Sequence, residues 1–192
     1  MGDFVPFGER AWWWLFGALA TGRCADLFST WVATPTLLLE ANPIARWMGW
    51  RWAVPVNLGL AGAFAFFPLP AVIIATTSSL VASRNLQQAW LMRSMGEESY
   101  RDWHVRRLLE TPPGLFMSCL ILQCLLMGAV GGVLAWVSES GGRVSLIPFG
   151  IGMGIVTYAL TVAFYTTIAL RRVRRSREFV APDSEPSPSD PE

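Results

Sequence analysis

Residues 11–33 read AWWWLFGALATGRCADLFSTWVA, an apolar stretch that is interrupted near its middle by Arg23 and Asp26. A helix of this length, at 1.5 Å per residue, crosses the roughly 30 Å hydrocarbon core of a bilayer. An ionisable side chain at that depth costs roughly 2.5 to 3.5 kcal/mol on insertion scales, so it needs a partner or a function. The stretch therefore predicts a membrane-spanning helix with one polar face.

The overall composition is also typical of a membrane protein. Of the 192 residues, 53% are hydrophobic and 15% are charged, and long apolar runs recur along the chain. The formal net charge of +1 argues against nucleic acid as a partner. The cysteines, Cys24, Cys119 and Cys124, all lie in apolar segments, and their odd number and spacing predict neither disulfides nor a zinc or haem site. We expect no cofactor and a lipid bilayer as the surroundings.

A cleavable signal peptide is the alternative interpretation of the first segment, because Ala18-Leu19-Ala20 resembles a cleavage site. Such a peptide needs a positively charged start, whereas Asp3 and Glu9 outweigh Arg10 here. We therefore expect a retained first span over 11–33.

The connector over 35–50 is expected to contain a short helix. Asn42 is a good N-cap, Pro43 suits the first helical position, and Gly49 can end the helix. Glu40 would lie near the positive N-terminus of this helix, so Glu40-x-Asn42-Pro43 has a structural explanation without a function.

The segment over 52–92 is either one kinked helix, 52–83, or two helices, 52–67 and 70–92, joined at Pro68-Leu69-Pro70. Two helices are favoured, because two prolines inside one span would break backbone hydrogen bonds that no water can replace.

Residues 93–113 are polar, and the pattern predicts a short helix at the membrane surface. At 100° per residue, Tyr100, Trp103, His104 and Leu108 share one arc of it. Ser94-x-x-Glu97 has the spacing of a capping box.

Two further spans are predicted over 114–137 and 145–170. Small residues four apart indicate close packing between helices, and the candidates for it are Gly128, Gly132, Gly150 and Gly154. An arginine-rich run follows, and then a tail rich in Pro, Ser and acidic residues that has the composition of a disordered segment.

These patterns predict an all-α, polytopic transmembrane helix bundle with five spans, or with four as the alternative. Arginines cluster between 84 and 107 and again after 170, so both regions and the C-terminus are expected in the cytoplasm. The 35–50 connector is cytoplasmic with five spans and external with four. The segments are a short N-terminal stretch, 1–10; a three-span module, 11–92; an amphipathic connector, 93–113; a two-helix hairpin, 114–170; and a basic and disordered tail, 171–192.

The polar face of the first span has two interpretations. Arg23, Asp26, Thr30 and Thr34 fall within about 80° of one another on a helix. Arg23 and Asp26 can neutralise each other while Thr30 bonds another helix, in which case the face only marks the inside of the bundle. Alternatively Asp26 binds a cation or proton, or Arg23 an anionic group, with Glu40 and Asn42 brought in by the connector. The first interpretation is favoured, because intramembrane charges face inward whether or not they do chemistry.

The order Asp26-x-x-x-Thr30, then Glu40-x-Asn42-Pro43, then a closely spaced pair of apolar helices resembles a family of small prokaryotic membrane proteins of unknown function, DUF5658. The resemblance covers about residues 15–92. It implies a three-span module in a prokaryotic inner membrane, which supports five spans, and it implies no activity. Members often carry a basic residue where this chain has Asn57, so no charge partner for Asp26 is expected there.

Three functional hypotheses follow. The leading one is a non-catalytic scaffold or accessory subunit, packed as a homo-oligomer or in a membrane complex, because no nucleophile, base and metal set is recognisable. The second is a transporter or channel-like protein for a proton, cation or polar solute that uses Arg23, Asp26 and Thr30. The least favoured is an intramembrane lipid-modifying enzyme.

Overall fold

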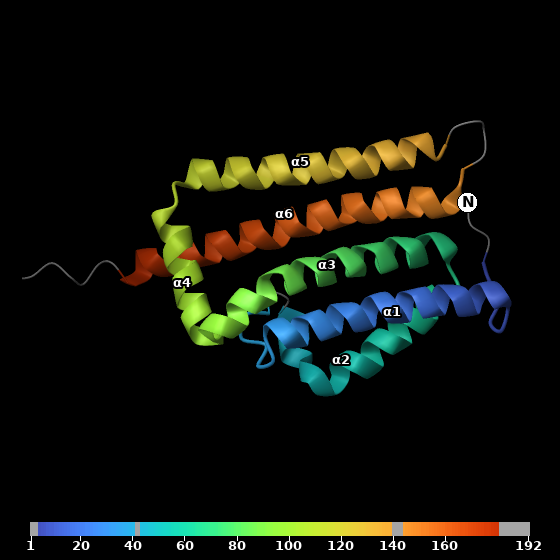
Figure 1. Ribbon diagram of the computed structural model, residues 1–192, viewed down its shortest axis with the longest axis horizontal. Helices are drawn as coiled ribbons and strands as arrows, with labels where there is room; N and C mark the ends of the chain where they lie inside the picture. The colour runs from blue at the N-terminus through green and yellow to red at the C-terminus, as the bar shows by residue number, and fades with distance from the viewer. Residues whose placement is uncertain (1–3, 41–42, 140–143, 181–192) are drawn as a thin grey trace, which may run out of the picture.

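The computed structural model describes residues 4–40, 43–139 and 144–180, and all regular structure within them is helical (Figure 1). The prediction of an all-α chain is therefore confirmed. The helices are α1 (Arg10–Ala33), α2 (Pro43–Phe64), α3 (Pro68–Met95), α4 (Glu97–Glu110), α5 (Pro113–Val137) and α6 (Leu146–Val180).

The two-helix interpretation of 52–92 is confirmed, because α2 ends at Phe64 and α3 starts at Pro68. Pro68 occupies the start of α3, where the missing N–H costs nothing. Within α2, Gly49 is non-helical, with φ 63° and ψ 178°, and ends the short first part as expected. The part over 50–64 then runs for roughly 22 Å, less than the roughly 30 Å of a bilayer core. Asn42, the predicted N-cap, lies outside the described residues.

Helix α4 lies across one end of the bundle (Figure 1) and is separated from α3 by Gly96, which has φ 80°. The capping-box prediction is wrong, because the Ser94 hydroxyl donates to the Leu91 carbonyl at 3.0 Å. Tyr100 and Leu108 are buried, so part of the predicted arc packs on the bundle.

Helix α6 continues through the arginine-rich run to Val180, beyond the predicted end at 170. Arginine is a good helix former, and neither Gly nor Pro occurs between Leu170 and Pro182. The predicted basic run is therefore part of α6, and the predicted disordered tail over 181–192 lies outside the described residues.

The long helices form a row in the order α5, α6, α3, α1, α2, each packed on the next (Figure 1). Hydrogen bonds near the helix termini show which segments lie together at each end of the bundle, along the direction of the helix axes. At one end the Val5 N–H donates to the Phe66 carbonyl at 3.0 Å. At the other end the 34–40 connector binds Glu97 of α4, and Arg174 of α6 approaches the Thr111 carbonyl at 3.5 Å. The chain therefore runs five times along the long axis of the molecule.

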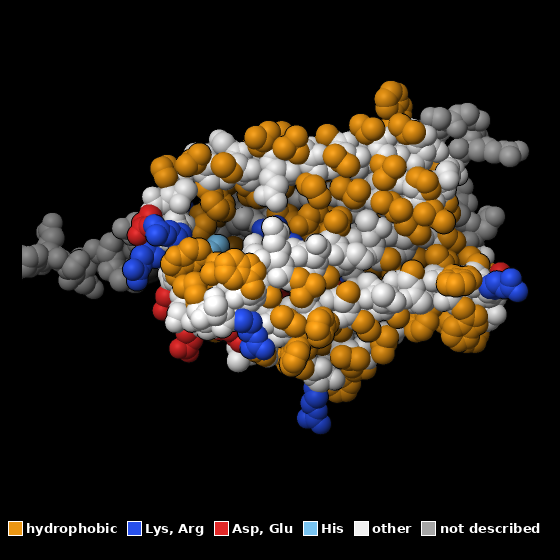
Figure 2. All heavy atoms as spheres, in the orientation of Figure 1, with side chains coloured by type: hydrophobic (Ala, Val, Ile, Leu, Met, Phe, Trp, Pro, Cys, Tyr) orange, Lys and Arg blue, Asp and Glu red, His pale blue; other side chains and the backbone are white. Residues whose placement is uncertain are grey.

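By length and composition, α5 and the Leu146–Arg174 part of α6 are each apolar enough to cross a membrane. Among the described helices these are the two that meet this criterion, since α1 carries Arg23 and Asp26 and α3 ends in polar residues. Helix α5 packs on α6 and leaves large apolar side chains exposed on its other faces, as the space-filling view shows (Figure 2).

Candidate polar site between the first three helices

The polar face of α1 is turned toward α3. The Arg23 Nη1 donates to the Ser78 hydroxyl at 3.1 Å, and the Asn85 Nδ2 donates to the Thr30 hydroxyl at 3.2 Å. Both pairs are 55 residues apart, as expected for two parallel helices in constant register. A Cβ on Gly22 would lie 3.1 Å from a carbonyl oxygen of α3, so this glycine lets the two backbones approach closely.

The guanidinium of Arg23 binds side chains from three helices. Its Nη1 also donates to the Asp26 carboxylate on the same helix, at 3.1 Å. Its Nε donates to Asn57 Oδ1 of α2 at 2.7 Å, and its Nη2 donates to the same oxygen. The Asn57 amide is oriented by its own helix, since Nδ2 donates to the Ala53 carbonyl at 2.6 Å. With Ser78, these contacts join α1, α2 and α3 at one cation.

Asp26 and Glu40 are brought toward each other. The Asp26 side chain is 18% exposed, and the charge of Glu40, at the end of the connector, acts on it. The structure thus gathers Arg23, Asp26 and Thr30 at one interface with Glu40 near its edge, while the predicted site residue Asn42 lies outside the described residues. Arg23 forms an ion pair with the Asp26 carboxylate of this group, at 3.1 Å.

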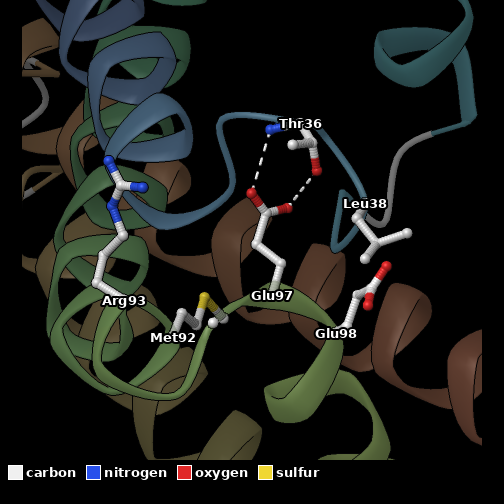
Figure 3. Close-up of a pocket in the computed structure, with 7 residues that line it drawn as sticks. Thr36, Leu38, Met92, Arg93, Glu97 and Glu98 are labelled. Atoms are coloured by element: carbon white, nitrogen blue, oxygen red, sulfur yellow. Dashed lines mark hydrogen bonds between the residues drawn. The ribbon is translucent and has the colours of Figure 1, made fainter.

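The polar face of α1 ends at a second cluster, where Glu97 holds the connector. The Thr34 and Thr36 hydroxyls each donate to Glu97 Oε2 at 2.6 Å, and the Thr36 N–H donates to Oε1 at 3.2 Å. Figure 3 shows the Glu97 carboxylate pointing at Thr36 across the mouth of a pocket of about 310 Å³, with Arg93 apart from it.

Opposing effects act on the Glu97 carboxyl. Burial raises its pKa, but the hydrogen bonds from Thr34, Thr36 and the Leu38 backbone outweigh burial, so the pKa lies below its ordinary value. Glu97 is therefore ionised at neutral pH and acts as an acceptor for the connector.

Sequence reasoning missed the residues that complete these contacts, which are Asn57, Ser78, Asn85 and Glu97. Two signals were present. Asn57 is the one amide in an otherwise apolar run, and Ser78 and Asn85 are seven apart, the same separation as Arg23 and Thr30.

The glycines of α6 pack against α3. A Cβ on Gly150 would lie 2.7 Å from Val72, and a Cβ on Gly154 would lie 2.7 Å from Thr76. Both glycines are thus places of close helix approach, as their spacing predicts.

The glycines predicted for close packing on α5 do not meet another described helix of this chain. Gly128 and Gly132 have nothing within 4 Å of an added Cβ, whereas a Cβ on Gly131 would lie 2.6 Å from the Gly152 carbonyl. The contact between α5 and α6 is therefore made one residue away from the predicted stripe, because α6 meets a different face of α5.

Comparisons of the chain with protein-family models, curated proteins and solved structures give no match. The resemblance to DUF5658 therefore stays a prediction. Within the part of the chain that the structure describes, no group of three or more His, Cys, Asp or Glu side chains is placed to hold a metal ion.

Proposed function

We propose that this protein is a non-catalytic integral membrane protein of the prokaryotic inner membrane, acting as a scaffold or accessory subunit of a membrane complex. The observation that supports this most directly is the use made of the polar face of α1. Arg23 donates to Asp26, Asn57 and Ser78, so its hydrogen bonds hold α1, α2 and α3 together. A polar group committed in this way is poorly suited to capturing a solute.

Five spans with a cytoplasmic C-terminus are part of this proposal. The connector contacts α4 through Glu97, and the far part of α6 contacts the end of α4 through Arg174. The three arginine-bearing regions then share one side, as the positive-inside rule requires. The short helical part of α2 would be accommodated by thinning of the bilayer or by flanking side chains that reach the interface. The resemblance of 15–92 to a family of prokaryotic membrane proteins agrees with this placement.

The outer faces of α5 are the proposed contact with lipid and with a partner. Leu122, Leu125 and Leu126 are each at least 60% exposed, a degree of apolar exposure that suits lipid rather than water. Gly128 and Gly132 are four apart and have open space beside them, so a second helix can approach there. The partner is another copy of the chain or another subunit of a membrane complex.

The test uses a substitution that the isolated chain tolerates. A Cβ added at Gly132 would meet nothing within 4 Å, so we expect Gly132→Leu to leave intramolecular packing intact and to interfere only with a helix from outside. Gly59→Leu, at an equally open glycine of α2, is the matched control. We expect the wild type and the control to run as one larger particle in mild detergent, by light scattering after gel filtration, and Gly132→Leu to run as a folded monomer. A wild type that is itself a monomer without any bound protein overturns the proposal.

Transport is the second candidate, and it rests on the 18% exposure of Asp26 and the nearby charge of Glu40. Asp26→Asn removes the charge and keeps the shape. If this variant assembles normally but abolishes a flux of protons or cations that wild-type proteoliposomes carry, the transport hypothesis replaces the scaffold. If it unfolds or fails to assemble, the structural role is supported.

A further inference from the structure

A polar cleft of about 300 Å³ lies between α3, α5 and α6, apart from the contacts of Arg23. Its polar lining consists of Ser83, Arg84, Gln87 and Gln88 from α3, Gln123 from α5 and Tyr158 from α6. The volume is at the lower end of the range of about 300 to 1,000 Å³ for small-molecule sites.

The polar side chains of this cleft can all donate hydrogen bonds. Among the described residues, none of the six makes a hydrogen bond or an ion pair with another side chain or with the backbone. Arg84 contributes a positive charge and no acidic residue lines the cleft, so its electrostatic character is that of an anion site. Arg84 thus contrasts with Arg23, which donates four hydrogen bonds to neighbouring side chains.

Its chemistry suits a phosphate group. A guanidinium, three amides and two hydroxyls can donate to several oxygens of one tetrahedral anion, and the hydrogen bonds from Arg are charge-assisted. Tyr158 is 7% exposed and packs in the cluster of Leu120 and Val162, so its hydroxyl is held at the cleft by a rigid wall.

In the proposed membrane placement, the part of the cleft formed by Arg84 and Gln88 lies at the depth of the lipid headgroups. If the membrane core begins at the start of α3, about 30 Å of helix ends near residue 88. Arg84 and Gln88 then lie close to that boundary. Arg84 also lies near the surface helix α4, since its charge acts on Tyr100.

We infer that the cleft between α3 and α5 binds a phosphate group, which Arg84 holds together with Gln123 and Tyr158. The source at this depth is the headgroup of an anionic phospholipid, and a soluble phosphate has the same chemistry. This inference rests on the proposed membrane placement for the lipid source.

The experiment measures binding of three probes to the full-length protein purified free of lipid in neutral detergent. Phosphatidylglycerol and phosphatidylcholine are titrated by native mass spectrometry, and inorganic phosphate by calorimetry. We expect phosphatidylglycerol to bind more tightly than phosphatidylcholine, and Arg84→Gln to weaken it about tenfold, as the loss of a charge-assisted hydrogen bond implies. Arg93→Gln removes the same charge from the same helix outside the cleft and should leave binding unchanged.

A second variant keeps the test decisive if Arg84→Gln does not fold. Gln123 is exposed on α5, so Gln123→Leu should fold normally and still bind phosphatidylglycerol several-fold more weakly. Circular dichroism and thermal unfolding verify each variant.

Binding of inorganic phosphate that depends on Arg84 in the same way supports the site and assigns it to a soluble ligand. Failure of all three probes to bind overturns the inference, and so does an equal loss in Arg84→Gln and Arg93→Gln, which would mean a diffuse charge effect. The particle mass and membrane fractionation of the wild type are measured on the same preparations. If particle mass and membrane fractionation are normal but no probe binds, only the inference about the cleft is refuted. If the protein does not enter the membrane, the proposed function is refuted.

Discussion

Replacing Asn57 by Leu tests whether Arg23 holds the first three helices together. Leu has the same branched arrangement of side-chain heavy atoms as Asn but neither donates nor accepts, so the substitution removes the two hydrogen bonds from Arg23 Nε and Nη2 and the one from Asn57 Nδ2 to the Ala53 carbonyl. Asn57 is 6% exposed, and water has little access to the vacated position. Arg23 keeps its contacts with Asp26 and Ser78 through Nη1.

The expected loss follows from three effects. Hydrogen bonds to a charged group contribute about 1.5 to 3 kcal/mol each in soluble proteins, whereas interhelical hydrogen bonds in a membrane protein average about 0.6 kcal/mol. Arg23 keeps its two contacts through Nη1, which limits the loss, and the new Leu gains some apolar burial. We therefore expect Asn57→Leu to lower the free energy of unfolding by about 2 kcal/mol, which is about thirtyfold in the unfolding equilibrium.

The measurement is unfolding in mixed micelles of increasing SDS content, followed by tryptophan fluorescence. Gln88→Leu is the matched control, because Gln88 is an exposed amide without a partner among the described residues, and it should change stability by less than about 0.5 kcal/mol. If Asn57→Leu unfolds together with the wild type and the control, Asn57 does not restrain Arg23 and the bracing role of this cluster is refuted.

Three further substitutions probe the packing and the connector. Gly22→Leu should separate α1 from α3 and lower the unfolding midpoint more than Asn57→Leu does, since even a Cβ would lie 3.1 Å from a backbone oxygen; an unchanged midpoint would contradict the close approach. Gly131→Leu should destabilise the α5–α6 hairpin whereas Gly128→Leu should not, which thermal unfolding of the two variants can compare. The pKa of the Glu97 carboxyl is lower in the folded protein than its ordinary value of 4.5, so the stability that it contributes is present above pH 4.5 and is lost as pH falls through the folded pKa. Glu97→Gln should therefore unfold more easily than the wild type at neutral pH and approach it in acid, and parallel melting curves across this range would count against the Glu97 contacts.

Helix boundaries were largely predictable from the sequence, because prolines and glycines act on their own backbone. The helix predicted over 11–33 corresponds to α1 (Arg10–Ala33), and the helix predicted over 114–137 corresponds to α5 (Pro113–Val137). The break before Pro68 and the positive φ of Gly49 were expected for the same reason. The end of α6 was placed too early because apolar character marks the length of a span and not the length of a helix.

The candidate site was predicted in part. The periodicity of α1 identified Arg23, Asp26 and Thr30 as one face, which is a local property of a helix. Their partners on other helices were not identified, because which helix lies opposite depends on the packing of the whole row. Glu97 shows the difficulty, since its spacing from Ser94 indicated a local cap while its carboxylate binds a connector more than 60 residues earlier in the chain.

The sequence by itself determined that the chain is helical, that its helices are long and apolar, and that the first carries a polar face with a charge pair. It also determined that glycines would allow close approach, since their spacing is a property of one helix. Only the tertiary structure decided that Gly131 meets α6 while Gly128 and Gly132 stay open, and that Asn57 and Ser78 close around Arg23. The physical reason is that a helix shows its periodicity in its own residues, whereas its rotation about its axis and its neighbours follow from the packing of all helices together.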